Sequence, residues 1–169
     1  MSGPADRYDL VLVRVALADR RAQALEDAML AETAERYRSD RPGPVDGADF
    51  DPPDGLFVLA VADGSPVGCG GFRRLAPDQA ELKRMYVVPS HRGKAVGRRL
   101  LRFLEEQALT AGYSAMWLET GTEQPEAVSL YVSSGYRPID PYGEFKDDRR
   151  SLGFSKTLCH QAAPEPRGH

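Results

Sequence analysis

The apolar positions of this chain follow two periods, and the switch between them separates expected strands from expected helices. Short runs rich in Val, Leu and Ala, each closed by Gly, Pro or Asp, are typical of strands. One such run, residues 56–62, reads Leu-Phe-Val-Leu-Ala-Val-Ala, and the turn Asp63-Gly64 joins it to the next. We expect strands at residues 10–15, 55–62, 66–75, 80–88, 114–120, 136–139 and 152–158.

Three further segments are typical of helices. The clearest lies at residues 95–112, where apolar residues recur every fourth position from Val96 to Ala108. Residues 18–37 are dominated by strong helix formers. Residues 125–134 open with a proline and are followed by a glycine, as helices commonly are.

The order of these elements, β-α-β-β-β-α-β-α-β-β, predicts one α/β (α+β) domain with a mixed, mostly antiparallel central sheet flanked by helices. Before the first hairpin, residues 38–55 form a long loop rich in Pro, Gly and Asp, and such loops are often lids or binding loops. We expect the domain to span residues 8–158, with flexible ends at 1–7 and 159–169.

The composition is that of a globular protein. The chain has 169 residues, of which 41% are hydrophobic and 28% charged. Its longest strongly apolar run, residues 56–62, is far shorter than the ~20 residues of a membrane-spanning helix, and residues 1–9 show no signal-peptide pattern. These features predict a cytoplasmic protein with no membrane partner.

The cysteines and histidines predict neither a disulfide framework nor a metal site. Cys69 and Cys159 have no zinc-type or paired spacing. His91, His160 and His169 lack the spacing of metal ligands.

Positive charge gathers in one segment of an otherwise acidic chain. The net charge of −3 argues against a nucleic-acid partner, yet residues 83–102 hold seven basic residues and no acidic one. The rest of the chain carries 15 basic against 25 acidic residues. Such a cationic island suits one compact polyanion, although a solvated basic face would have the same composition.

Inside this island, a strand end is followed by a basic, glycine-containing turn and then by an amphipathic helix. The first N–H groups of a helix lack partners and carry partial positive charge, so they can hold phosphate oxygens. Gly93 and Gly97 let a ligand approach the backbone. Arg98 and Arg99 lie in the first turn, where cations are disfavoured by ~0.3–1 kcal/mol unless an anion binds there. The segment therefore predicts a phosphate-bearing ligand.

Neither the mononucleotide P-loop pattern nor the Rossmann glycine pattern occurs in the chain. The glycine-rich run Gly68-Cys69-Gly70-Gly71 lies inside an expected strand. There it is better suited to bending or close packing than to ligand binding.

Three motifs resemble the GNAT superfamily of acetyl-CoA-dependent N-acetyltransferases. Residues 92–97, Arg-Gly-Lys-Ala-Val-Gly, resemble that family's pyrophosphate loop, Gln/Arg-x-x-Gly-x-Gly/Ala. Residues 82–87 resemble its central strand, and residues 126–136 resemble its Ala-x-x-Leu-Tyr-x-x-x-Gly-Phe/Tyr helix. The resemblance covers nearly the whole chain and implies a GNAT-like fold with acetyl-CoA as co-substrate. The residues that it implies in binding acetyl-CoA are Met85, Tyr86, Val87, Arg92, Gly93, Lys94, Ala95, Val96, Gly97, Arg98, Gln124 and Tyr131.

Two positions depart from the family's pattern. Ala95 replaces the first loop glycine, which would tilt a backbone amide or shift the phosphate slightly. Gln124 stands where many relatives have an asparagine that helps to hold the pantetheine arm. Alanine adds only a methyl group and glutamine keeps an amide, so neither change abolishes binding.

In the family, strand amides near Met85 and Val87 bind the pantetheine arm and polarise the thioester carbonyl. Successive side chains of a strand point to opposite faces, and Leu82 has an even number whereas Met85 and Val87 have odd ones. In a regular strand Leu82 would therefore face away from Met85 and Val87, so the apolar face switches between them. A bulge near Lys83-Arg84 would produce that switch and aim free amides at a ligand. A strand buried on both faces would show the same pattern.

Acetyl transfer to an amine needs a base for the amine and a proton for the leaving thiolate. Glu81 and Glu119, on strands flanking the expected thioester position, are the candidate bases, although strand-end acids are more often solvated or salt-bridged. Tyr131 resembles the family's phenol that protonates the CoA thiolate. Its alternative role is aromatic packing against the sheet.

The acceptor is the least defined part of the sequence-based hypothesis. Five acidic residues lie in the long loop, where the family binds its varied acceptors, and they would attract a small cationic primary amine. Aspartate also simply favours turns. A second loop, residues 141–145, offers two aromatic side chains and an acid to the same pocket. The five loop acids are Asp40, Asp46, Asp49, Asp51 and Asp54.

The sequence therefore predicts an N-acetyltransferase in which a small-molecule amine attacks the thioester of acetyl-CoA directly. A non-catalytic acyl-CoA sensor or interaction module, and a protein or peptide N-acetyltransferase, are the alternatives. By resemblance a homodimer is also possible.

Overall fold

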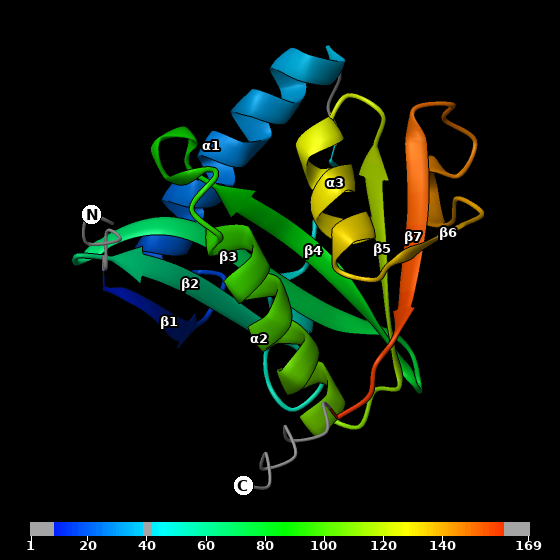
Figure 1. Cartoon of the computed structure of the whole chain (residues 1–169), viewed down its shortest axis with the longest axis horizontal. Coiled ribbons are helices and arrows are strands. Elements are labelled where there is room, and N and C mark those ends of the chain that lie inside the picture. Colours follow the sequence, from blue (N-terminus) through cyan, green and yellow to red (C-terminus); the bar gives the residue numbers. More distant parts are fainter. Residues whose placement is uncertain (1–8, 39–41, 161–169) are drawn as a thin grey trace, which may run out of the picture.

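The computed structural model describes residues 9–38 and 42–160. The flexible ends were expected at 1–7 and 159–169, and of these residues 1–7 and 161–169 lie outside the described part. Seven strands form one sheet in the order β1-β2-β3-β4-β5-β7-β6 (Figure 1). Every strand pair is antiparallel except β4–β5, which is parallel. This confirms the predicted mixed, mostly antiparallel sheet. The strands are β1 (Leu10–Val15), β2 (Leu56–Ala62), β3 (Ser65–Ala76), β4 (Gln79–Val87), β5 (Ala115–Gly121), β6 (Arg137–Ile139) and β7 (Ser151–Thr157).

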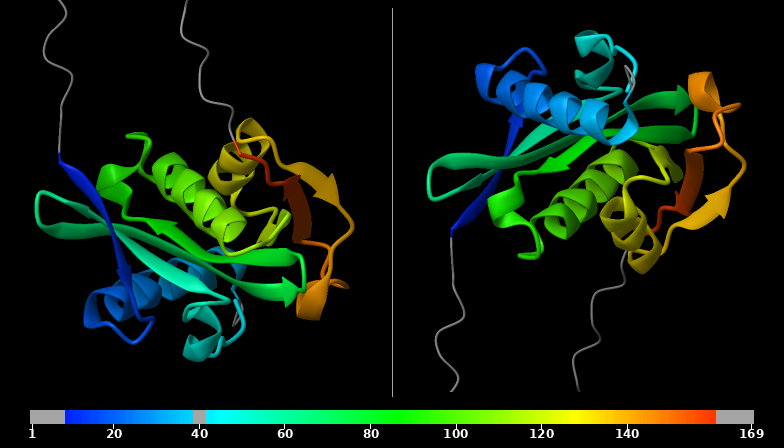
Figure 2. Two further views of the ribbon diagram at one scale, coloured as in Figure 1. Left: turned by 90° about the horizontal axis from the view of Figure 1, so that it is seen from below. Right: turned by 90° about the horizontal axis from the view of Figure 1, so that it is seen from above.

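Helices cover both faces of this sheet. Helices α2 (Val96–Thr110) and α3 (Pro125–Ser133) lie on one face, and α1 (Arg20–Tyr37) lies on the other (Figure 2). Both faces of β2 are therefore buried: Val58 packs in the core under α2, and Phe57 packs in the core under α1. This explains the unbroken apolar run of that strand, because neither face meets water.

The described part of the long loop, residues 42–55, contains local structure that the sequence did not predict. It contains a short 3-10 helix, η1 (Gly47–Phe50), whose Phe50 is 1% exposed and packs edge-on against Phe57. Two further 3-10 turns, η2 (Pro89–His91) and η3 (Gly143–Phe145), lie in connecting segments. Within the described residues, no helix has the length and apolarity needed to cross a membrane.

The glycine run of β3 serves close packing, as expected. A Cβ placed on Gly70 would collide with the Met85 sulfur, and one placed on Gly71 would lie 2.6 Å from the Leu56 carbonyl oxygen. The absence of side chains at these positions lets β4 and β2 approach β3 closely.

A β-bulge in β4 confirms the parity argument. Cys69 of β3 lies opposite Tyr86 and Gly71 lies opposite Lys83, so two β4 residues face the single residue between them. One of the two, Arg84, has the left-handed φ of 62°. The bulge places the side chains of Lys83 and Arg84 on the same face, the one covered by α1.

Arg84 anchors the bulge to helix α1. Its side chain is only 3% exposed, its Nε donates to Glu26 Oε1 at 2.9 Å, and its guanidinium also donates to the Gly43 carbonyl at 2.7 Å. A buried guanidinium needs such partners because an unpaired charge in the interior is costly. The ion pair therefore helps to fix the left-handed backbone at this position.

We expect Glu26→Gln to lower the free energy of unfolding by about 2–3 kcal/mol, because the substitution leaves the buried Arg84 charge without a counter-charge. Urea unfolding followed by circular dichroism measures the loss. The exposed Glu106→Gln is the control and should change little. Equal stability of Glu26→Gln and the wild type would show that this ion pair contributes no net stability.

Candidate active site

The site forms where β4 and β5 part. Their parallel pairing ends at Leu82 and Leu118. Beyond that point β4 continues beside β3 as far as Val87, and β5 continues beside β7 as far as Gly121 (Figure 1). The backbone edge of β4 that faces β5 thus loses its strand partner along the bulged half of the strand. Such an edge offers N–H and C=O groups to a ligand.

A cleft of about 360 Å³ lies along this unpaired edge, between α1, α3 and the start of α2. It brings together every residue expected to bind acetyl-CoA except Lys94, which is not part of its lining. The predicted residues that line it are Met85, Tyr86, Val87, Arg92, Gly93, Ala95, Val96, Gly97, Arg98, Gln124 and Tyr131.

The loop before α2 closes one end of this cleft. The N–H of Arg99 donates to the Ala95 carbonyl at 3.0 Å. The amides of Val96, Gly97 and Arg98 precede it in the first turn, where a helix offers N–H groups no acceptor of its own. Gly93 is left-handed, with φ of 76°, and has open space beside its Cα. The chemistry of this loop fits a pyrophosphate group.

A second, smaller cleft of about 100 Å³ adjoins the first on the side of the bulge. Lys83, Arg84 and Glu119 supply its charged lining. Tyr131 lines both clefts and so stands at their junction. Its side chain is buried, and this burial raises the pKa of the phenol, which keeps the proton on the oxygen. The junction therefore joins the larger cleft to a small polar one, with a protonated phenol between them.

A family model described as the acetyltransferase (GNAT) family matches residues 21–136. The chain belongs to the GNAT family of acetyltransferases. It is 40% identical over 107 residues to the IAA acetyltransferase of Azospirillum brasilense. The aligned region covers 63% of this chain and 70% of that protein.

Solved structures share the fold. A protein from Klebsiella pneumoniae described as an acyl-CoA N-acyltransferase is 27% identical, with a TM-score of 0.76 over 90% of this chain and 99% of the other. A GNAT acetyltransferase from Elizabethkingia anophelis, whose structure contains acetyl-CoA, has a TM-score of 0.65 at 16% identity over 88% and 98% of the two chains. As a GNAT acetyltransferase, this protein is an acyltransferase with acetyl-CoA as its co-substrate.

Neither departure from the GNAT loop and helix patterns disrupts the cleft. Ala95 takes the left-handed φ of 62°, a conformation that costs an L-residue roughly 1–2 kcal/mol, so the turn is kept despite the missing glycine. The Gln124 side-chain oxygen accepts a hydrogen bond from the Tyr37 hydroxyl at 3.1 Å, which holds the amide at the wall of both clefts.

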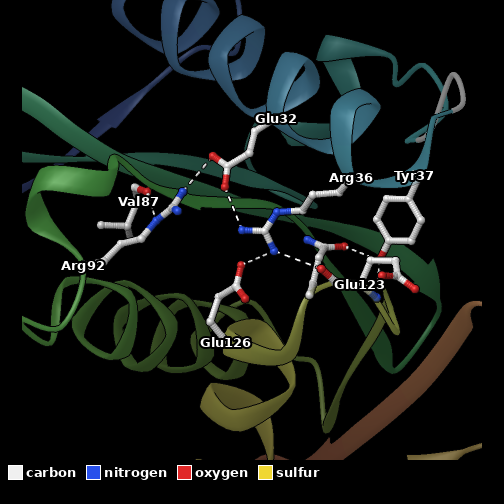
Figure 3. Close-up of polar contacts among 8 residues, drawn as sticks. Glu32, Arg36, Tyr37, Val87, Arg92, Glu123 and Glu126 are labelled. Atoms are coloured by element: carbon white, nitrogen blue, oxygen red, sulfur yellow. Dashed lines mark hydrogen bonds and ion pairs between the residues drawn. The ribbon is translucent and has the colours of Figure 1, made fainter.

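Arg92 has contacts within the protein that sequence analysis did not anticipate. Its guanidinium donates to Glu32 Oε2 at 2.8 Å and to the Val87 carbonyl at 2.9 Å (Figure 3). It also lies over the Tyr86 ring, 5.6 Å from the centroid. Arg92 thus ties the pyrophosphate loop to α1 and to the end of β4.

Glu32 continues this network toward α3. It also accepts from Arg36 at 2.8 Å, and Arg36 in turn pairs with Glu126 and donates to the Glu123 carbonyl (Figure 3). The hydrogen bond from Arg92 is the largest of the effects that lower the pKa of the Glu32 carboxyl. The i, i+4 spacing of Glu32 and Arg36 was visible in the sequence, but their partners lie far away along the chain.

The two candidate bases occupy different surroundings. Glu119 lines the second cleft, and its Oε1 accepts a hydrogen bond from the Ser151 hydroxyl at 2.9 Å. Glu81 lines neither cleft, and its side chain is 5% exposed. Its Oε1 lies 3.0 Å from the Nε of Arg73, so this carboxylate already has a partly buried cationic partner. Of the two candidates, Glu119 is therefore the one that lines a cleft.

The acidic residues in the described part of the long loop line neither cleft. Asp46 caps η1, Asp49 pairs with Arg73 at 3.6 Å, and Asp54 pairs with Arg74 at 2.8 Å. Asp51 also lines neither cleft, and Asp40 lies outside the described residues. Within the described residues, these acids serve turn formation and surface pairing, so they give no support to a cationic acceptor.

The second loop, residues 141–145, packs beside the site without lining the two clefts. Tyr142 contacts Trp117 edge-on at 5.4 Å between ring centroids. Burial, with the nearby charges of Glu81 and Glu119, raises the pKa of its phenol. Among the described residues, no group of three or more His, Cys, Asp and Glu side chains is arranged to hold a metal ion.

Proposed function

We propose that this GNAT enzyme transfers the acetyl group of acetyl-CoA to the primary amine of a small molecule, by direct attack of the amine on the thioester. The position of Tyr131 at the junction of the two clefts, with Glu119 in the smaller one, carries this proposal. The larger cleft would take the co-substrate and the smaller one the acceptor.

In the proposed reaction, Glu119 accepts a proton from the acceptor's ammonium, directly or through water, so that the nitrogen lone pair becomes available. The nitrogen forms a bond to the thioester carbon while unpaired N–H groups of the bulged half of β4 stabilise the negative charge on the carbonyl oxygen. The C–S bond then breaks, the thiolate takes the phenolic proton of Tyr131, and the nitrogen gives up its second proton, which restores the phenol. The products are an amide and CoA.

The pyrophosphate loop and the Arg92–Glu32–Arg36 network serve binding in this scheme. The free amides of the loop hold phosphate oxygens, and the network keeps the loop, α1 and α3 in fixed positions around the pantetheine arm. Holding the thioester against the smaller cleft lowers the entropic cost of bringing the two reactants together.

The test combines calorimetric titration with a thiol-release assay. Acetyl-CoA, CoA and succinyl-CoA are titrated first, and CoA release is then followed over a panel of primary amines. Tight acetyl-CoA binding with CoA release dependent on an amine supports the proposal, and comparison with succinyl-CoA identifies the acyl group. Binding without release on any amine would instead support a non-catalytic acyl-CoA sensor.

A further inference from the structure

Lys83 and Glu119, one basic and one acidic residue, both line the smaller cleft. Lys83 and Glu119 directly follow Leu82 and Leu118, the last residues paired between β4 and β5. Leu82 and Leu118 point into the core under α2, so alternation places Lys83 and Glu119 on the opposite face, toward α1. Neighbouring strands are about 5 Å apart, so the two side chains start from adjacent positions at the mouth of one small cleft.

Lys83 lies farther from its carboxylate partner than the neighbouring Arg84 does from its own. Arg84 has its own carboxylate in Glu26 at 2.9 Å. Glu81 is held by Arg73 at 3.0 Å and lies 3.8 Å from Lys83 Nζ. Within the described part of the chain, the ion pair of Lys83 is this 3.8 Å contact with Glu81. The Lys83 side chain is nevertheless only 23% exposed. A partly buried ammonium with so loose a partner gains by binding a second anion.

We propose that Lys83 binds the carboxylate of the acceptor, and that the acceptor is a free amino acid, whose amine then lies toward Glu119. This inference rests on the proposed function. An α-amino acid carries its ammonium and its carboxylate on one carbon, which matches a carboxylate and an ammonium on adjacent strands. A polyamine would instead bring a second cation up to Lys83, and like charges would repel.

The experiment compares each of a panel of L-amino acids with its own carboxamide in the thiol-release assay. The carboxamide keeps the α-amine and the side chain and removes only the negative charge. We expect kcat/KM to be at least about 10-fold higher for the preferred amino acid than for its amide, the discrimination of one charge-assisted contact. The full chain is used throughout.

Lys83→Gln should raise KM for the preferred amino acid about 10-fold and leave KM for acetyl-CoA unchanged, and the preference for the acid over the amide should disappear. Lys146→Gln, at an exposed position away from both clefts, is the matched control and should behave as the wild type. A purely structural role of Lys83 would lower the rates with acid and amide equally, which would overturn the inference.

The outcomes separate this inference from the proposed function. Transfer to amides or polyamines at rates equal to or above those for amino acids overturns the inference and leaves the acetyltransferase proposal standing. Amino-acid transfer that keeps its preference in Lys83→Gln overturns the role of Lys83. Acetyl-CoA binding without transfer to any amine overturns both.

Discussion

Tyr131→Phe is expected to lower kcat by about 10²-fold or more while leaving acetyl-CoA affinity nearly unchanged, because it removes the proton that the departing thiolate needs. The phenol is buried at the junction of the two clefts, and burial raises its pKa, so the hydroxyl stays protonated across the working pH range. Phenylalanine keeps the ring and its edge-on contact with Tyr136 at 5.7 Å. Thiol release measures kcat, and calorimetric titration measures the affinity.

Tyr136→Phe is the matched control for this experiment. Tyr136 is also buried, packs against Tyr131 and lines neither cleft. The loss of its hydroxyl should therefore leave kcat close to that of the wild type. Wild-type turnover in Tyr131→Phe would assign Tyr131 to packing alone, and an equal loss in both variants would indicate disturbed packing rather than a missing proton.

Glu119→Gln should lower kcat by about 10²–10⁴-fold, the usual contribution of a general base. The amide keeps the size of the side chain and the oxygen that accepts from Ser151, but it cannot take a proton from the acceptor. In the wild type a base removes the acceptor's proton, whereas the variant depends on the fraction of the acceptor's amine that is already neutral. We therefore expect kcat of the variant to fall further below that of the wild type as the pH is lowered. Rates of thiol release between pH 5 and 10 measure the profile.

Glu81→Gln provides the comparison for the pH profile. Glu81 is held by Arg73 and lies outside both clefts, so the variant should lose stability but keep the shape of the wild-type profile. If Glu81→Gln shows the loss that grows at low pH and Glu119→Gln does not, Glu81 is the base. If neither variant shows it, neither strand carboxylate takes the proton.

The Arg92 network changes how the basic island is understood. Sequence analysis predicted that the basic residues of the loop bind a phosphate-bearing ligand. In the structure, the Arg92 guanidinium donates hydrogen bonds to Glu32 and to the Val87 carbonyl. In the structure, the loop offers mainly backbone amides to a phosphate, and Arg92 fixes the loop that carries them. Arg98 similarly donates to the hydroxyls of Ser133 and Ser134, which joins α2 to the end of α3.

The sequence by itself determined the order of the elements and the motif of residues 92–97, and it offered the bulge as one of two explanations for the pattern of β4. Each of these depends on residues that are near one another along the chain. Periodicity and turn residues set the strands and helices, residues 92–97 are contiguous, and the switch of apolar parity between Leu82 and Met85 marks the bulge within one strand.

Only the tertiary structure decided which charged groups meet. Glu32 and Arg92 lie 60 residues apart, and Glu26 and Arg84 lie 58 apart, so no local pattern links them. Glu81 and Glu119 are alike in type and lie on neighbouring strands. What separates them is the point where β4 and β5 diverge, since only the carboxylate beyond that point reaches the cleft. A side chain's partner depends on how distant segments pack, and therefore the roles of these residues follow from the fold.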